Sequence, residues 1–148
     1  MIRHSIRTLA RIGALLALSA SAARAQATFS VDPLLIRLNA DTNNAVLTIS
    51  NPTANEIRFE IKGFAWDQSP PNGVMQLTPT NDLVISPPLV TLKAHTTQRV
   101  RIGTTVAQGP IEKAYRVLIE ELPNSAKPAT ANQVAVRTRI GVPVFIES

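Results

Sequence analysis

The stretch from Gln133 to Ile146 alternates apolar and other side chains over most of its length. A period of two places the two sets on opposite faces of an extended strand. One face carries Val134, Val136, Ile140, Val142, Val144 and Ile146, and the other carries Ala135, Arg137, Arg139 and Gly141. Pro143 cannot donate a ladder hydrogen bond, so this end of the strand is expected at a sheet edge or a bulge. Such an edge strand either closes the protein's own sandwich or stays open to pair with another chain.

The first 25 residues have the pattern of a secretory signal peptide. Basic residues precede an apolar run from Ile12 to Ala23, and Ala23–Arg24–Ala25 supplies a small-x-small cleavage site. The run is shorter than a membrane-spanning helix requires, although an N-terminal anchor is the alternative. We therefore expect an exported protein without stable membrane insertion, with residues 1–25 removed and residues 26–148 forming one domain.

Charge and cysteine content narrow the functional classes. Four of the fifteen basic residues precede the expected cleavage site and no acidic ones do, which leaves eleven basic against ten acidic residues. A nearly neutral chain gives no reason to expect a nucleic-acid partner. The sequence contains no cysteine, so neither disulfides nor thiol chemistry is available, which is compatible with a periplasmic location.

The sequence offers no pattern typical of an enzyme, a metal site or a cofactor site. His95 is the only histidine after the leader, and it lies in a turn, where a surface role is expected. Glu120 and Glu121 are adjacent on an expected strand and so point to opposite faces, unlike a catalytic carboxylate pair. Phe64 and Trp66 could line a ligand groove, but core and rim positions are the usual role of such aromatic residues. We predict a non-enzymatic protein without cofactor or metal.

The rest of the domain reads as strand after strand between turn signals. The only segment that also fits a helix is Glu112–Leu122, and neighbouring strand patterns favour a strand there. About seven strands with regular turns predict an all-β fold, an immunoglobulin-like antiparallel β-sandwich. The expected strands lie in Thr28–Asn39, Ala45–Ser50, Ile57–Trp66, Val74–Leu77, Leu83–Ser86, Leu89–Leu92, Thr97–Gly103, Lys113–Leu122 and the C-terminal stretch.

An ordered set of short motifs resembles a known family. The set comprises Val31-Asp32-Pro33, Leu47-Thr48-Ile49-Ser50-Asn51, Phe64-Ala65-Trp66, Ser86-Pro87-Pro88, Gln98-Arg99-Val100-Arg101-Ile102, Tyr115 to Pro123, and Val142-Pro143-Val144-Phe145. Together they resemble the PapD-like periplasmic pilus chaperones of the chaperone–usher pathway, nearest to the non-classical, archaic branch. The likeness covers essentially all of the chain after the leader, and the segment Tyr115 to Pro123 is its most specific element.

This resemblance implies a chaperone that acts by donor-strand complementation. Such chaperones lend an edge strand with alternating apolar residues to a pilus subunit that lacks its last strand, and then pass the subunit to an outer-membrane usher. Val134, Val136 and Ile140 match the donor positions, with Thr138 as a polar insertion between them. The alternative is that these side chains face the domain's own core.

The chain departs from the family at the site that anchors the subunit's terminal carboxylate. Classical members use an arginine in the first strand and a lysine in the last, and the matching positions here are Leu35 and Gly141. Arg37 and Arg139 lie two residues away, roughly 7 Å along their strands. They could form a shifted carboxylate clamp through charge-assisted bonds, or they could be ordinary exposed arginines.

A second departure is length, because the family has two domains and this chain ends at Ser148, where the linker would begin. Arg101 and Glu121 match residues of an interdomain ion pair in the family. The alternative function is an exported immunoglobulin-like structural or adhesive subunit that assembles by strand exchange. A periplasmic copper-binding sandwich is a third class, and it fails for want of histidine and methionine.

Overall fold

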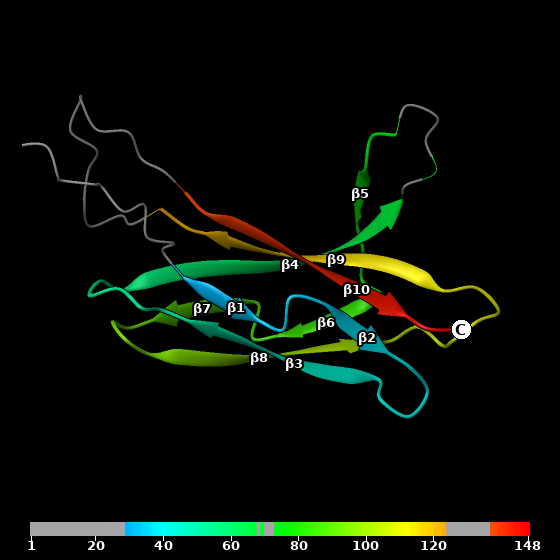
Figure 1. Ribbon diagram of the computed structural model, residues 1–148, viewed down its shortest axis with the longest axis horizontal. Helices are drawn as coiled ribbons and strands as arrows, with labels where there is room; N and C mark the ends of the chain where they lie inside the picture. The colour runs from blue at the N-terminus through cyan, green and yellow to red at the C-terminus, as the bar shows by residue number, and fades with distance from the viewer. Residues whose placement is uncertain (1–28, 68, 70–72, 124–136) are drawn as a thin grey trace, which may run out of the picture.

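Two β-sheets packed face to face form the protein in a computed structural model, which describes residues 29–67, 69, 73–123 and 137–148 (Figure 1). The four-stranded sheet has the order β1 (Ser30–Asp32), β3 (Asn44–Ser50), β8 (Thr97–Thr104) and β6 (Leu83–Ser86). The six-stranded sheet has the order β2 (Ile36–Leu38), β10 (Arg139–Ile146), β9 (Lys113–Glu121), β4 (Ile57–Asp67) and β5 (Gln76–Pro79), with β7 (Leu89–Leu92) also paired to β4. The all-β immunoglobulin-like sandwich expected from the sequence is confirmed.

The described residues form ten strands where about seven were expected, and of the nine stretches expected to hold strands one is divided into two. The stretch Thr28–Asn39 contains two strands in different sheets, separated at the cis Asp32–Pro33 bond. β1 pairs antiparallel with β3, whereas β2 pairs parallel with β10, so the sandwich is not entirely antiparallel. The helical alternative for Glu112–Leu122 is wrong, since these residues form β9 between β4 and β10. Among the described residues, no helix is long and apolar enough to cross a membrane.

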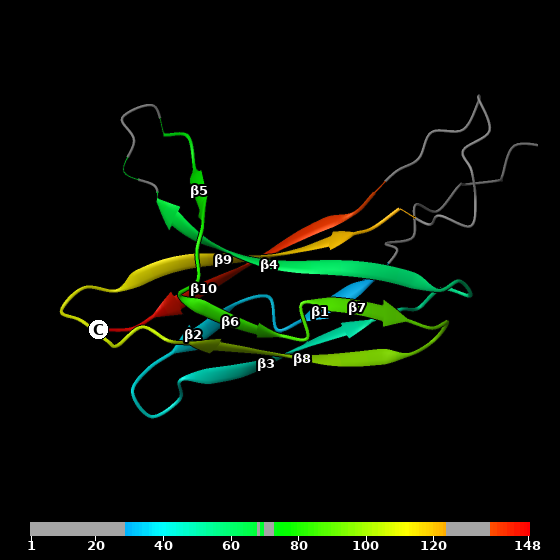
Figure 2. The same cartoon turned by 180° about the vertical axis from the view of Figure 1, so that it is seen from behind.

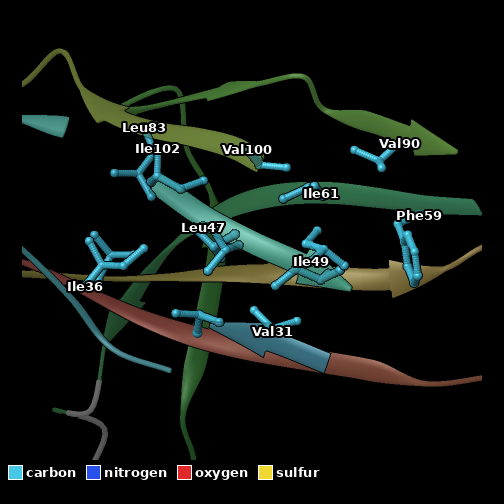
Figure 3. Packing of buried hydrophobic residues seen from close by; sticks show 14 of the residues in the cluster. Val31, Ile36, Leu47, Ile49, Phe59, Ile61, Leu83, Val90, Val100 and Ile102 are labelled. Atoms are coloured by element: carbon cyan, nitrogen blue, oxygen red, sulfur yellow. The ribbon is translucent and has the colours of Figure 1, made fainter. Parts of the chain in front are cut away.

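The core lies between the two sheets and follows the predicted alternation. Leu47 and Ile49 of β3 point towards Phe59 and Ile61 of β4 (Figure 3), and all four side chains are buried. The side chains that alternate with them point away from the core: Arg58 and Lys62 of β4 are exposed, and Thr48 of β3 is half-buried. Each buried side chain of this size contributes about 1.5–3 kcal/mol to folding, so the alternating strands account for the two-layer architecture.

Asn51 is a buried polar residue that ties three segments together. Its amide nitrogen donates to the backbone carbonyls of Asn55, Lys93 and Leu92, at 2.7, 3.0 and 3.3 Å. Its side-chain oxygen accepts from the backbone nitrogen and the hydroxyl of Thr53, at 2.9 and 2.7 Å. The side chain therefore gives a donor to carbonyl groups at and just beyond the end of β7 and in the loop after β3.

A second polar contact joins the two sheets. Tyr115 of β9 has a buried ring, and its hydroxyl donates to the Asp82 carboxylate at 2.8 Å, just before β6. Burial raises the pKa of Tyr115 far above its ordinary value, and the hydrogen bond to Asp82 and the negative charge of Asp82 raise it further. The folded protein thus holds the neutral phenol more strongly than the unfolded chain does.

Replacing Asn51 with alanine should lower the free energy of unfolding by about 2–3 kcal/mol, because buried carbonyls lose their donor. Urea unfolding followed by tryptophan fluorescence measures the change. Asn55→Ala is the matched control: it removes an exposed amide and keeps the backbone carbonyl that Asn51 uses, so it should change stability little. Equal losses in the two variants would contradict the role assigned to Asn51.

Stability should fall with rising pH above about 10, where the tyrosine of the unfolded chain ionises. The pKa of Tyr115 is higher in the folded protein than in the unfolded chain. The contribution of Tyr115 to the free energy of unfolding is therefore complete below about pH 10, and it is lost as the pH rises towards the pKa of the folded state. The chain contains one tyrosine, so Tyr115→Phe removes the whole effect. The variant should be about 1 kcal/mol less stable at pH 8, and the gap should narrow at pH 11. A gap that stays constant between these pH values would contradict the assignment.

Candidate functional site

The C-terminal strand β10 is the element on which the candidate site lies, and most of its apolar face serves the protein's own core. Val142, Val144 and Ile146 are buried, and Ile140 is partly buried and packs against the same cluster. For this half of the strand, the structure supports the first of the two alternatives, that the strand closes the protein's own sandwich. Val134 and Val136 lie outside the described residues.

The ladder between β9 and β10 fixes where the backbone of β10 points. The backbone nitrogen of Glu121 donates to the carbonyl of Thr138 at 3.0 Å, and Ile140 lies opposite Ile119 in the same antiparallel register. Because hydrogen-bonded pairs alternate in such a ladder, Ile140 bonds to β9. The N–H and C=O groups of Arg139 and Gly141 therefore point to the other side of β10.

That other side is only partly covered. β2 pairs with β10 from Val144 to Ile146, opposite Ile36 to Leu38, and no other described strand lies beside β10 there (Figure 2). The backbone of Arg139 to Pro143 is thus an unpaired sheet edge, which we call the open edge. Pro143 lies where the open edge gives way to β2, so its missing N–H costs no bond to β9. This agrees with the edge position expected for Pro143.

Gly141 allows a close approach on the outer face of the sheet. A Cβ atom there would lie 3.1 Å from Cδ of Arg116 and 3.2 Å from Cδ2 of Leu118. With glycine, the stem of Arg116 lies flat over β10, and its guanidinium stacks 4.5 Å from the Trp66 ring centre. The same guanidinium donates to the Met75 sulfur at 3.2 Å. Gly141 therefore helps to join β10 to the end of β4 and to Met75, just before β5.

Aromatic side chains continue this arrangement towards β2. The rings of Trp66 and Phe145 lie 5.9 Å apart, and the guanidinium of Arg37 lies 5.6 Å from the Phe145 ring. Phe64 lines a separate hollow of about 290 Å³ on the same face, together with Leu77 and Leu118 and with charged residues at its rim. Phe64 and Trp66 are thus on the outer face and not in the core.

The two arginines considered as a carboxylate clamp lie far apart. Arg37 faces Phe145 in the register of β2 and β10, six residues along β10 from Arg139, which is roughly 20 Å. Each already has an acidic partner: Arg37 lies 3.3 Å from Glu147, and Arg139 lies 2.9 Å from Glu120. The structure therefore does not bring the two guanidinium groups to one point.

Arg101 and Glu121 belong to different sheets. Arg101 is exposed on β8, whereas Glu121 ends β9, and its carboxylate accepts a hydrogen bond from the backbone nitrogen of Thr138 at 3.3 Å. Their role between domains stays a prediction. None of the described residues form a group of three or more His, Cys, Asp or Glu suited to a metal ion.

Sequence reasoning named Leu35 only as a position where the chain departs from the family, and it missed that Leu34 and Leu35 are both exposed beside the open edge. Leu34 and Leu35 connect β1 to β2 and are 68% and 44% exposed, although Val31 and Ile36 on either side are buried. A signal was present in the sequence, because Leu34, Leu35 and Ile36 follow one another. Three consecutive apolar residues cannot all point to one side of a strand.

Comparison with solved structures identifies similar folds. One match is a structure of the CsuC–CsuE chaperone–tip adhesion subunit pre-assembly complex from archaic chaperone–usher Csu pili of Acinetobacter baumannii, with 20% identity and a TM-score of 0.69 over 82% of this chain. Another is the Salmonella enterica SafA pilin in complex with the SafB chaperone, with 19% identity and a TM-score of 0.64, also over 82%. This chain covers 57% and 55% of the matched chains in these two structures.

The same fold also occurs in an unrelated setting. A PapD-like domain of human CEP192 matches with 13% identity and a TM-score of 0.55, covering 82% of this chain and 84% of that domain. Structural likeness at this level of identity therefore establishes the fold alone. No curated protein sequence matches the chain.

The family assignment comes from the sequence profile. The profile described as "Pili and flagellar-assembly chaperone, PapD N-terminal domain" matches residues 28–147, from just before β1 to just after β10. This range includes both sheets and the open edge. The chain belongs to the family of pili and flagellar-assembly chaperones, as a PapD N-terminal domain.

Proposed function

We propose that this protein is a periplasmic chaperone that holds pilus subunits by lending them the edge of its C-terminal strand. The observation that carries the proposal is the open edge of Arg139 to Pro143, which continues a strand whose apolar face is otherwise used in the core. Membership of a chaperone family supports it, as do similar folds in complexes of a chaperone with a pilin or a tip subunit.

In this proposal, the alternating apolar residues of the C-terminal stretch serve two hydrophobic cores, that of the chaperone and that of the bound subunit. Val142, Val144 and Ile146 complete the chaperone's own sandwich. Val134 and Val136 have the same parity and are proposed to fill the groove of the subunit, at about 1.5–3 kcal/mol for each buried side chain. The open edge adds main-chain hydrogen bonds that do not depend on the partner's side chains.

The two described donor positions contribute unequally in this proposal. Ile140 is partly committed to the protein's own core, so only part of its side chain is left for a subunit. Thr138 offers little apolar area, and its backbone bonds to Glu121. Specificity for the subunit is therefore assigned mainly to Val134 and Val136, with Thr138 and Ile140 aligning the strand.

The proposal also includes the setting in which such a chaperone works. Residues 1–25 direct export to the periplasm and are removed, and residues 26–148 hold the subunit until an outer-membrane usher accepts it. Arg101 and Glu121 are assigned to contacts with a second chaperone domain, as the family resemblance implies.

The alternative of a structural subunit that assembles by strand exchange is less well supported. Such a subunit needs a gap where its last strand would lie. Here β10 occupies that place and buries Val142 and Val144 fully. The sandwich does not require a strand from a neighbour to complete its core.

The direct experiment mixes the purified protein with a pilus subunit encoded in the same genome and measures the mass of the product by light scattering after gel filtration. A one-to-one complex that Val136→Asp abolishes is the expected result, because a carboxylate would be buried in the subunit's groove. The proposal would be overturned if the subunit stayed aggregated in the presence of the unaltered protein as well as of the Val136→Asp variant.

Gly141→Pro should weaken subunit capture at least tenfold, whereas Gly141→Ala should change it less than threefold. Both variants place a Cβ against Arg116 and Leu118, but only proline removes the N–H group that points away from β9. Surface-bound subunit and titrated chaperone give the affinities, and urea unfolding checks that both variants fold. Equal affinities for the two variants would show that the open edge does not form main-chain bonds.

Arg139→Ala should change the free energy of unfolding by less than about 1 kcal/mol, because its pairing with Glu120 is solvent-exposed. It should also lower the affinity for a subunit less than threefold, since the side chain already has an acidic partner and lies far from Arg37. Glu120→Ala is the control for the loss of the ion pair. A loss of tenfold or more for Arg139→Ala alone would instead identify Arg139 as a carboxylate ligand.

A further inference from the structure

We propose that Leu34 and Leu35 form an apolar end to the partner-strand site, so that the bound strand places an apolar side chain there and not a free terminal carboxylate. This inference rests on the proposed function and defines which partner strands the open edge accepts. It assigns a specificity-determining role to two residues that are not needed for the protein's own core.

The first step is topological. A strand that pairs with Arg139 and Gly141 cannot continue along β10 past Pro143, because β2 occupies that side from Val144 onwards. Ile36, the first residue of β2, faces Val144, so Leu35 and Leu34 lie directly before the point where the open edge ends. A partner strand must therefore stop or turn aside next to these two leucines.

The second step concerns exposure. Leu34 and Leu35 are 68% and 44% exposed, whereas Val31 before them and Ile36 after them are 8% and 2% exposed. The segment crosses from one sheet to the other, and a connection of this kind usually carries polar residues. Two adjacent leucines at the end of an unpaired edge form a small apolar surface that a partner's side chain can cover.

The third step concerns charge. A carboxylate buried without a cation is strongly unfavourable. Arg37 is already paired with Glu147 at 3.3 Å and approached by Glu112 at 3.8 Å. Arg116 lies opposite Pro143, and its guanidinium is stacked on Trp66 and donates to the Met75 sulfur. Asp32 precedes the leucines and is exposed, so it adds a negative charge on the same segment. These surroundings favour a partner strand that places an apolar, uncharged residue beside Leu34 and Leu35 over one that ends there with a free carboxylate.

The test uses a labelled peptide of two lysines followed by five Thr-Val pairs, made with either a C-terminal amide or a free carboxylate. Fluorescence anisotropy with the purified protein should show at least threefold tighter binding of the amide. The double variant Leu34→Ser, Leu35→Ser should weaken binding of the amide about tenfold and abolish the difference. Leu35→Lys should reverse the preference in favour of the carboxylate.

Leu89→Ser is the matched control, because Leu89 is 60% exposed on β7, away from β10, and its replacement should change neither affinity. Urea unfolding should show all variants to be folded, since the altered side chains are exposed. Equal or tighter binding of the carboxylate form by the unaltered protein, or an unchanged affinity of the double variant, would overturn the inference alone. Peptide binding that Gly141→Pro leaves intact, or no binding of either peptide, would overturn the proposed strand pairing as well.

Discussion

The pairing of β9 with β10 is the interaction on which the rest of the structure depends. It aligns Arg139 to Ile146 with Glu120 to Lys113, and it thereby sets which backbone groups of β10 are satisfied and which face outwards. The same register places Val142 and Val144 in the core and Gly141 beneath the side chain of Arg116. A shift by one residue would exchange the two faces, exposing the valines and burying arginine. The register between β9 and β10 therefore determines the core packing, the outer face and the open edge together.

An unpaired edge next to an apolar strand face carries a risk of uncontrolled pairing with other chains. Three features of β10 limit this risk. Pro143 lacks a donor, β2 covers the last part of the strand, and Arg139 and Glu120 place charges at its beginning. The edge that remains is short, so in the proposed function it would suit a chaperone that releases its subunit better than permanent assembly. In the proposed function, strong binding then requires a partner whose groove also takes Val134 and Val136.

The outer face of the six-stranded sheet shows how a strand with a free edge can be held firmly. Arg116 stacks on Trp66, Trp66 contacts Phe145, and Arg37 lies over Phe145, so side chains from four strands form one continuous layer. Cation–π contacts of this kind contribute about 0.5–1 kcal/mol each at exposed sites. The contacts at Phe145 support β10 where β2 also pairs with it, and the stem of Arg116 supports β10 at Gly141, in the open edge.

Much of the fold could be predicted because strand alternation is a local property. The buried sets of β3, β4, β9 and β10 follow directly from their period of two, and turn residues mark most of the boundaries. The change of sheet at Pro33 could not be predicted, because the residues on both sides of it are extended and only their neighbours differ. The contacts of Asn51 with Leu92 and Lys93 could not be predicted either, since they join positions about forty residues apart.

The features of the candidate site also fall into those that the sequence predicts and those that only strand pairing reveals. The order of residues was enough to predict that the last strand has an apolar face and carries a proline typical of sheet edges, because both are local properties. The tertiary structure was needed to show that Val142, Val144 and Ile146 serve the protein's own core and that β2 pairs with β10 only from Val144 onwards, which leaves Arg139 and Gly141 unpaired on that side. It also separated Arg37 from Arg139 and placed Leu34 and Leu35 at the end of the open edge. Pairing between distant strands creates these relations, and a pattern within one strand does not contain them.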